Sequence, residues 1–303
     1  MANLEGGYVV NQIIASIKNH RSIRNYLEKD IPEEMLQEIL EAAKAMPTSI
    51  NGQQISIIVI KDKDKKEKIA EWTGGQPWIA QAPVFLVFVA DFYKAYIACE
   101  KNGKQEIIHE SIEGSLVGAF DAGLAMGAAI ISAESLGLGI VPIGAVRKKP
   151  QEMIDLLGLP KYTYPLVGLV VGYPADASAQ KPRFPLKTLV HVEQYQKDEI
   201  GPAIDEYDAV MSKYYSERGD KDTNWSKQVA NAYKQVYFPD VYPTMKKQGF
   251  KNDKAVSGGR AAVDSRIKHR LQKILPSRFR VQLSAHIIPR MLERNVYYPV
   301  PEA

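Results

Sequence analysis

The chain has 303 residues, of which 45% are hydrophobic and 24% are charged, a composition typical of soluble globular proteins with a sizeable core. Its formal charge of +4 is too small to indicate nucleic-acid binding, and the positive excess lies entirely in residues 251–303, which carry eleven basic and four acidic side chains. One cysteine, Cys99, excludes a disulfide within one chain and fits a reducing compartment. We find no signal sequence and no uncharged apolar run of about eighteen residues, so we expect a cytoplasmic protein without a membrane span.

Hydrophobic periodicity predicts helices interspersed with short strands. One helix begins at Pro32, because proline is tolerated in a first turn and Glu33 and Glu34 suit the positive end of the helix dipole, and it ends before Pro47. In chain order, the predicted helices cover residues 8–18, 32–46, 62–72, 110–136, 150–157, 200–218 and 225–237, and the predicted strands cover residues 55–60, 84–90, 138–146 and 166–172.

The predicted helix 110–136 is unusually rich in glycine and alanine. Small residues allow another backbone to approach closely, and a helix that is apolar on most sides is buried, either in a core or in a subunit interface. We favour the interface. The charged, turn-like residues 219–224 are expected to form a surface loop.

Residues 20–24, with the sequence HRSIR, are the most informative cluster. Arginine offers a planar fork of donors and serine adds a hydroxyl, which together suit a phosphate monoester. A solvated basic turn would read the same way. Four further segments carry groups suited to a phosphate or a flat ring, although each alone is also typical of an ordinary loop: the polar residues 48–53, the turn 74–76, the strand end 142–145 and the basic segment 181–183.

Several other chemistries lack their sequence signatures. The chain has no G-x-G-x-x-G after a strand and no Walker A sequence. Its five histidines are scattered without ligand spacing, so we expect no metal site. Ser115 does not stand in a G-x-S-x-G elbow, which disfavours a serine hydrolase.

Taken together, these segments resemble the oxygen-insensitive nitroreductase and flavin reductase family, in its NADPH-dependent branch. The resemblance covers about residues 10–250. Its matching elements occur in the family's order and spacing and have the sequences HRSIR (20–24), TGGQ (73–76), AESLGLG (133–139), IG (143–144), GYPAD (172–176), KPR (181–183) and QGF (248–250).

The resemblance implies an α+β fold, with a central, mostly antiparallel sheet flanked by helices, in an intertwined homodimer that binds FMN at the subunit interface. It implies an FMN-binding domain over residues 1–250, followed by a basic extension, residues 251–303, for which we expect disorder or loose docking. The implied FMN-binding residues fall into three roles: phosphate, ribityl and pyrimidine contacts (His20, Arg21, Ser22, Arg24, Lys181 and Arg183), the ring edge (Ser49, Asn51 and Gln53), and the ring itself (Gln76, Ile143 and Gly144).

The chain departs from the family where the 2′-phosphate of NADPH is often held by paired arginines. The corresponding loop is GDKDTN, residues 219–224, so Arg218 and Lys221 are the candidate contacts and the preference for NADPH over NADH is open. Phe238 stands where relatives carry an arginine, and Pro142 and Ala145 stand where close relatives have tyrosine and glycine.

The resemblance implies a ping-pong oxidoreductase that passes hydride from NADPH or NADH through FMN to nitroaromatics, quinones or similar flat acceptors. An alternative is a flavin reductase that supplies free reduced FMN. A third interpretation is a flavin-binding or nucleic-acid-associated protein dominated by its basic extension; we do not expect it, because the rest of the chain is net negative.

Overall fold

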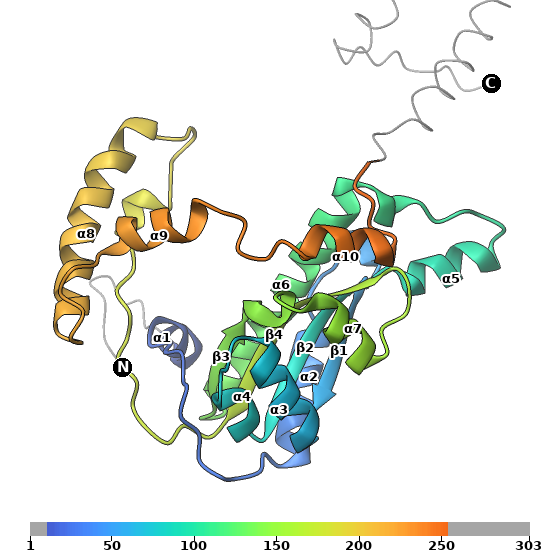
Figure 1. Ribbon diagram of the computed structural model, residues 1–303, viewed down its shortest axis with the longest axis horizontal. Helices are drawn as coiled ribbons and strands as arrows, with labels where there is room; N and C mark the ends of the chain where they lie inside the picture. The colour runs from blue at the N-terminus through green and yellow to red at the C-terminus, as the bar shows by residue number, and fades with distance from the viewer. Residues whose placement is uncertain (1–10, 254–303) are drawn as a thin grey trace, which may run out of the picture. The chain divides into compact units, whose positions relative to one another are not determined.

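The computed structural model describes residues 11–253 (Figure 1). Within them, one sheet has the strand order β1-β2-β4-β3, and every neighbouring pair is antiparallel. Its strands are β1 (Ile55–Ile60), β2 (Val84–Asp91), β3 (Gly139–Ile143) and β4 (Thr163–Gly172). The helices are α1 (Gln12–Lys18), α2 (Glu33–Lys44), α3 (Lys63–Trp72), α4 (Trp78–Gln81), α5 (Tyr93–Lys101), α6 (Ile112–Ser135), α7 (Pro150–Leu157), α8 (Ile200–Ser216), α9 (Trp225–Tyr233) and α10 (Val241–Gln248).

Strand β2 is buried along its whole length and divides the core into two layers. Side chains alternate across a strand, so Phe85, Val87 and Val89 face one layer while Leu86 and Phe88 face the other. The first layer packs against α3, α4 and α7, and the second packs against α2 and α6. Figure 1 shows the sheet between these two sets of helices.

Helix α6 buries a stripe of small residues against the second layer, including Ala122, Ala125 and Ala129. By length and composition alone, α6 could cross a membrane, as the core helix of a soluble protein also could. About a third of its most apolar stretch is buried inside the fold. The opposite side of α6 exposes large apolar side chains, and the role of this helix in a subunit interface stays a prediction.

Two glycines allow close packing that no other residue would permit. An added Cβ at Gly139 would lie 2.6 Å from Cγ1 of Ile23, and one at Gly168 would lie 2.2 Å from Cζ of Phe85. The first glycine lets residues 20–24 run beside β3. The second lets the Phe85 ring pack directly against the backbone of β4.

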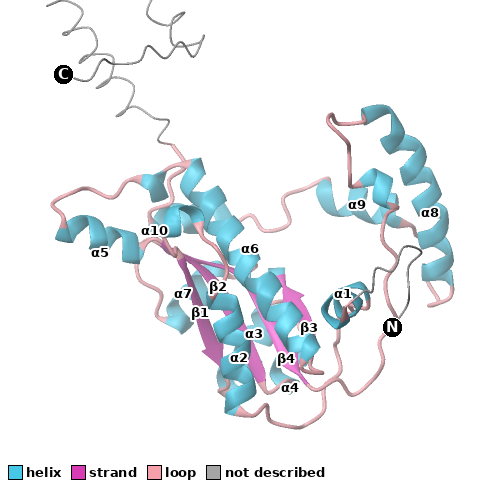
Figure 2. Ribbon diagram, turned by 180° about the vertical axis from the view of Figure 1, so that it is seen from behind, coloured by secondary structure: helices cyan, strands magenta, loops and turns pink. Residues whose placement is uncertain are grey.

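Helices α8 and α9 pack against each other around Phe184, Tyr207 and Trp225, whose rings are in mutual contact. At another edge of the fold, α5 and α10 lie near the end of the described chain (Figure 2). There Phe250 is fully buried against Phe92 and Tyr164. The basic residues after 253, and the predicted start of the first helix at residue 8, lie outside the described residues.

The predicted strands and long helices are present, with corrected ends. The strand predicted over 138–146 stops at Ile143, because the chain turns into a one-turn 3-10 helix, Gly144–Arg147, that buries Val146. Pro142 is tolerated because β3 is an edge strand. The helix predicted over 225–237 ends at Tyr233, and the helix predicted over 200–218 ends at Ser216.

Three helices were missed, for identifiable reasons. Helix α4 has only four residues, none of the residues of α5 is buried, and α10 carries a proline in its first turn. Such segments lack the apolar stripe by which a helix is recognised in a sequence.

Candidate functional site

Residues 20–24 form an extended segment beside strand β3. Ser22 makes a parallel bridge with Ile140, and the Ile23 amide donates to the Ile140 carbonyl at 2.9 Å. Ile23 is buried in the core. Because side chains alternate in an extended chain, Ser22 and Arg24 point away from that core. The parallel register brings Arg24 level with Pro142, next to the predicted ring-backing residues.

His20 is held by the far end of helix α6. Its Nδ1 lies 2.6 Å from Oε1 of Glu134, and both side chains are largely shielded from solvent. The helix therefore fixes the start of the cluster, while β3 fixes its middle. Arg21 is exposed, so its guanidinium is available to a ligand.

The turn at residues 74–76 lies beside Arg24. Gln76 donates from Nε2 to the Thr73 carbonyl at 2.9 Å, and the guanidinium carbon of Arg24 is 5.8 Å from the centre of the Trp78 ring. Gly74 and Gly75 have φ values of +97° and +75°, which L side chains rarely adopt, so the tight turn requires glycine. A Cβ on Gly74 would lie 3.3 Å from Nζ of Lys148, which places this turn next to the chain that follows β3.

The basic segment 181–183 lies at the end of helix α1. Gln180 donates from its side chain to the Lys18 carbonyl, two residues before His20. Tyr207 on α8 donates its hydroxyl to the Pro182 carbonyl at 2.8 Å, which fixes the segment from the other side. Lys181 and Arg183 are exposed.

These contacts bring most of the predicted residues into one region. We call it the main group, and it consists of His20, Arg21, Ser22, Arg24, Gln76, Ile143, Gly144, Lys181 and Arg183. It combines exposed cations with a half-buried amide and a strand end at which Gly144 carries no side chain.

The remaining predicted residues, Ser49, Asn51 and Gln53, lie elsewhere in the same chain, and we call them the loop group. The Ser49 amide lies 3.3 Å from each carboxylate oxygen of Asp121 on α6. Glu134, which contacts His20, stands thirteen residues farther along that helix. At 1.5 Å per residue the two anchor points are about 20 Å apart along the axis. One chain therefore does not bring the loop group to the main group.

The candidate NAD(P)H contacts are separate from both groups. The guanidinium carbon of Arg218 lies 4.2 Å from the centre of the Tyr214 ring, and Lys221 is exposed between α8 and α9. A hollow of about 460 Å³ between these helices is lined by aromatic residues together with Lys181 and Arg183. It joins the basic segment of the main group to α8 and α9, whereas neither Arg218 nor Lys221 lines it.

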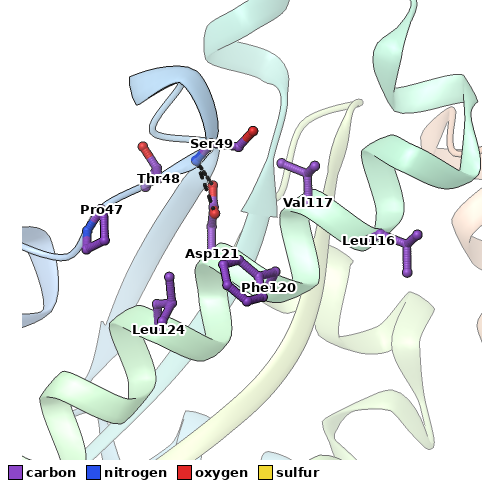
Figure 3. Close-up of a pocket in the computed structure, with 8 residues that line it drawn as sticks. All are labelled: Pro47, Thr48, Ser49, Leu116, Val117, Phe120, Asp121 and Leu124. Atoms are coloured by element: carbon purple, nitrogen blue, oxygen red, sulfur yellow. Dashed lines mark hydrogen bonds between the residues drawn. The ribbon is translucent and has the colours of Figure 1, made fainter. Parts of the chain in front are cut away.

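A groove of about 660 Å³ lies between residues 47–49 and helix α6, beside the hydrogen bond from Ser49 to Asp121 (Figure 3). Pro47, Thr48 and Ser49 form one wall, and the helix supplies the other, including Leu116, Phe120 and Leu124. Leu116 is 60% exposed and Phe120 is 67% exposed, so this apolar side of α6 is uncovered in a single chain.

Two residues that position the site were not among the predicted ones. Glu134 contacts His20 across 114 positions of sequence, and Asp121 contacts Ser49 across 72. Asp121 did carry a signal, namely an isolated carboxylate within an otherwise small and apolar stretch. That signal indicates a polar partner without identifying it.

Comparison with known proteins places these features in a family. The pattern of the nitroreductase family matches residues 17–173, and that of the family's C-terminal domain matches residues 181–253. The FMN reductase [NAD(P)H] of Bacillus subtilis (strain 168) is 51% identical over 250 residues, which cover 81% of this chain and 100% of that protein.

Solved structures agree with the sequence matches. The structure of B. megaterium NfrA2 has a TM-score of 0.79 and 47% identity, covering 81% of this chain and 100% of that one. The NADPH:FMN oxidoreductase from Vibrio harveyi, complexed with NAD+, has a TM-score of 0.73 and 32% identity, covering 80% of this chain and 99% of that one.

Proposed function

The chain belongs to the nitroreductase family, and we propose that it is an FMN-dependent NAD(P)H oxidoreductase, which passes hydride from NADPH or NADH by way of FMN to a flat acceptor such as a nitroaromatic or a quinone. The predicted α+β nitroreductase-like fold is confirmed by the solved structures it resembles. The observation that carries the proposal is the convergence of the main group from four separate segments of the chain.

The chemistry of the main group fits FMN. Exposed arginine and lysine side chains supply charge-assisted donors for a phosphate and for the pyrimidine edge of the ring. The strand end at Ile143 and Gly144 carries no side chain at Gly144, so a ring can lie against its backbone, and Gln76 supplies an amide from the turn beside Arg24. FMN would supply the hydride chemistry when bound, and the residues of the main group would bind it, orient it and place positive charge beside its pyrimidine edge.

We further propose that the protein acts as a homodimer. The exposed apolar side of α6 is suited to a second copy of the chain, because Leu116 and Phe120 would be buried there. A second copy also resolves the separation of about 20 Å between the two groups, since the loop group of one protomer can reach the main group of its partner. Each FMN site would then be built from both chains.

Arg24→Ala tests the proposal at its centre. Removing a charge-assisted contact should weaken FMN binding by about 1.5–3 kcal/mol, measured by titrating the FMN-free protein and following flavin fluorescence. Arg218→Ala removes an exposed arginine outside the main group and serves as the control. Equal affinities of both variants and the parent would show that residues 20–24 do not bind the cofactor.

The co-substrate and the acceptor are also open to direct measurement. Anaerobic reduction by NADPH and by NADH, compared between the parent and Lys221→Ala, tests whether the loop at 219–224 selects a nicotinamide. Steady-state rates with nitrofurazone and with free FMN separate the proposed nitroreductase from the alternative, a flavin reductase that releases reduced FMN. We place the enzyme in the cytoplasm, in keeping with its single cysteine.

A further inference from the structure

We propose that Asp121 is a positioning residue, which holds residues 48–53 in the conformation that meets the flavin ring of the partner protomer. This inference rests on the proposed function and names a residue that neither binds FMN nor touches the substrate. Asp121 is 1% exposed on a helix whose neighbouring buried residues are glycine and alanine, which is an unfavourable environment for a carboxylate.

The contact between Asp121 and the loop is specific. The Ser49 amide points between the two carboxylate oxygens, 3.3 Å from each, and Figure 3 shows the side chain rising from α6 toward the loop. Among the described residues, no lysine, arginine or histidine lies within ion-pair distance of Asp121. The loop amide is therefore the partner that the structure gives this carboxylate.

The loop needs an external support. Ile50, Asn51 and Gln53 have φ values of 50°, 54° and 50°, a left-handed conformation that is strained for residues other than glycine. Such strain persists only where the surroundings enforce it. Bonds inside the loop, from the Asn51 amide to the Thr48 carbonyl and from the Gln53 amide to the Thr48 hydroxyl, close it on itself but do not fix it to the fold.

Packing does not provide that support. Thr48 and Asp121 line two hollows at once, the groove of about 660 Å³ beside α6 and a second hollow of about 310 Å³ that reaches toward β1. Ile50, at the tip of the loop, is 97% exposed. The loop therefore spans open space, and the bond from Ser49 to Asp121 ties it to α6.

The carboxylate carries a cost that supports this role. Burial raises the pKa of the Asp121 carboxyl above its ordinary value, and the hydrogen bond from Ser49 offsets only part of that shift. An apolar residue at this position would spare the fold the desolvation of a charge. A carboxylate that costs stability while holding a functional loop is the pattern expected of a residue kept for position rather than for folding.

The test compares three variants. Asp121→Leu removes the acceptor at similar volume, Asp121→Asn keeps one acceptor oxygen, and Asp155→Leu makes the same chemical change at an exposed position of α7. Hydrogen exchange of a peptide covering residues 47–54 is measured in the FMN-free protein, together with the FMN dissociation constant and the melting temperature.

We expect Asp121→Leu to accelerate exchange of the 47–54 peptide and to raise the FMN dissociation constant by about tenfold, the equivalent of one charge-assisted hydrogen bond. Its melting temperature should be unchanged or higher. Asp121→Asn should stay within about threefold of the parent in affinity, and Asp155→Leu should match the parent in all three measurements. Should Asp121→Leu fail to fold, Asp121→Ala, which cannot overpack the site, takes its place.

The outcomes are distinct. The inference would be overturned if Asp121→Leu matched the parent in exchange and in FMN affinity. It would also be overturned if the loss of FMN affinity came with a lower melting temperature, because a purely structural role would explain both. If the parent protein itself does not bind FMN, the proposed function fails, while the exchange of the 47–54 peptide still decides whether Asp121 holds the loop.

Discussion

Gly139→Ala should disturb both the fold and the cofactor site, because it acts on the seam between residues 20–24 and strand β3. The added methyl would lie 2.6 Å from Cγ1, 2.9 Å from Cβ and 3.1 Å from Cγ2 of Ile23. A rotation of the Ile23 side chain cannot relieve the contact with Cβ. The backbone must move, although it is held by the bond from the Ile23 amide to the Ile140 carbonyl.

Overpacking of this kind costs about 1–3 kcal/mol. For a domain of this size each kcal/mol corresponds to about 2–4 °C in melting temperature, so we expect a decrease of about 2–12 °C. Ser22 and Arg24 flank Ile23, so FMN affinity should fall as well. Ile23→Ala removes the contacts of the added methyl with Cγ1 and Cγ2 but keeps the one with Cβ. Alone it should cost about 2–5 kcal/mol, and because part of the overpacking is relieved, the loss in the double variant should be smaller than the sum of the two separate losses.

The assay is thermal unfolding of the FMN-free protein combined with FMN titration, on the two single variants and the double variant. Gly201→Ala is the matched control, since a Cβ at that position meets no atom within 4 Å. A Gly139→Ala protein that melts and binds FMN like the parent would refute the argument that this glycine sets the path of residues 20–24. Strict additivity in the double variant would refute the assigned contact.

Three shorter predictions address other contacts. Tyr207→Phe removes the donor to the Pro182 carbonyl and should weaken FMN binding by about 0.5–1.5 kcal/mol, with little change in melting temperature. An unchanged affinity would show that α8 does not help to position residues 181–183 for FMN. Lys66→Met should lower stability by about 1–3 kcal/mol in urea unfolding, because the buried ammonium donates to the Ala82 carbonyl and, at 3.4 Å, to that of Pro83, whereas Lys63→Met should not. Between pH 3.8 and its raised pKa, the Asp121 carboxyl binds more protons in the folded than in the unfolded chain, so its contribution to stability falls as pH rises. The difference in melting temperature between Asp121→Asn and the parent should therefore grow across this pH window and level off above it. A difference that does not change with pH would contradict the argument from burial.

The layered fold could be predicted because its signals are local. The apolar run at 84–90 and the small-residue helix at 110–136 each carry their own pattern, and both are found in place. Helix α5 could not be predicted in the same way, because it buries none of its residues and therefore has no apolar stripe.

Much of the candidate site could be proposed from the sequence for a different reason, and its role in binding FMN stays a prediction. Residues 20–24 combine unusual chemistry in a short stretch, so their role can be inferred before their neighbours are known. The contacts that position them cannot be inferred, because Glu134 and Asp121 are distant in sequence from His20 and Ser49. The sequence also does not show which residues of α6 contact His20 and Ser49. Only the distance along α6 between those two contacts shows that the main group and the loop group of one chain lie apart.

The distance along α6 between the main group and the loop group has a consequence for dimers that combine two different variants. If each reaction centre draws on both protomers, a defect at Arg24 and a defect at Asp121 damage different halves of it. Two proteins with weakened FMN binding, one with each lesion, should then yield a mixed dimer in which one of the two centres contains only undamaged halves. Co-expression with two affinity tags allows the doubly tagged mixed dimer to be isolated. At an FMN concentration that leaves both single-lesion homodimers largely without cofactor, the mixed dimer should recover up to about half of the turnover of the unsubstituted protein.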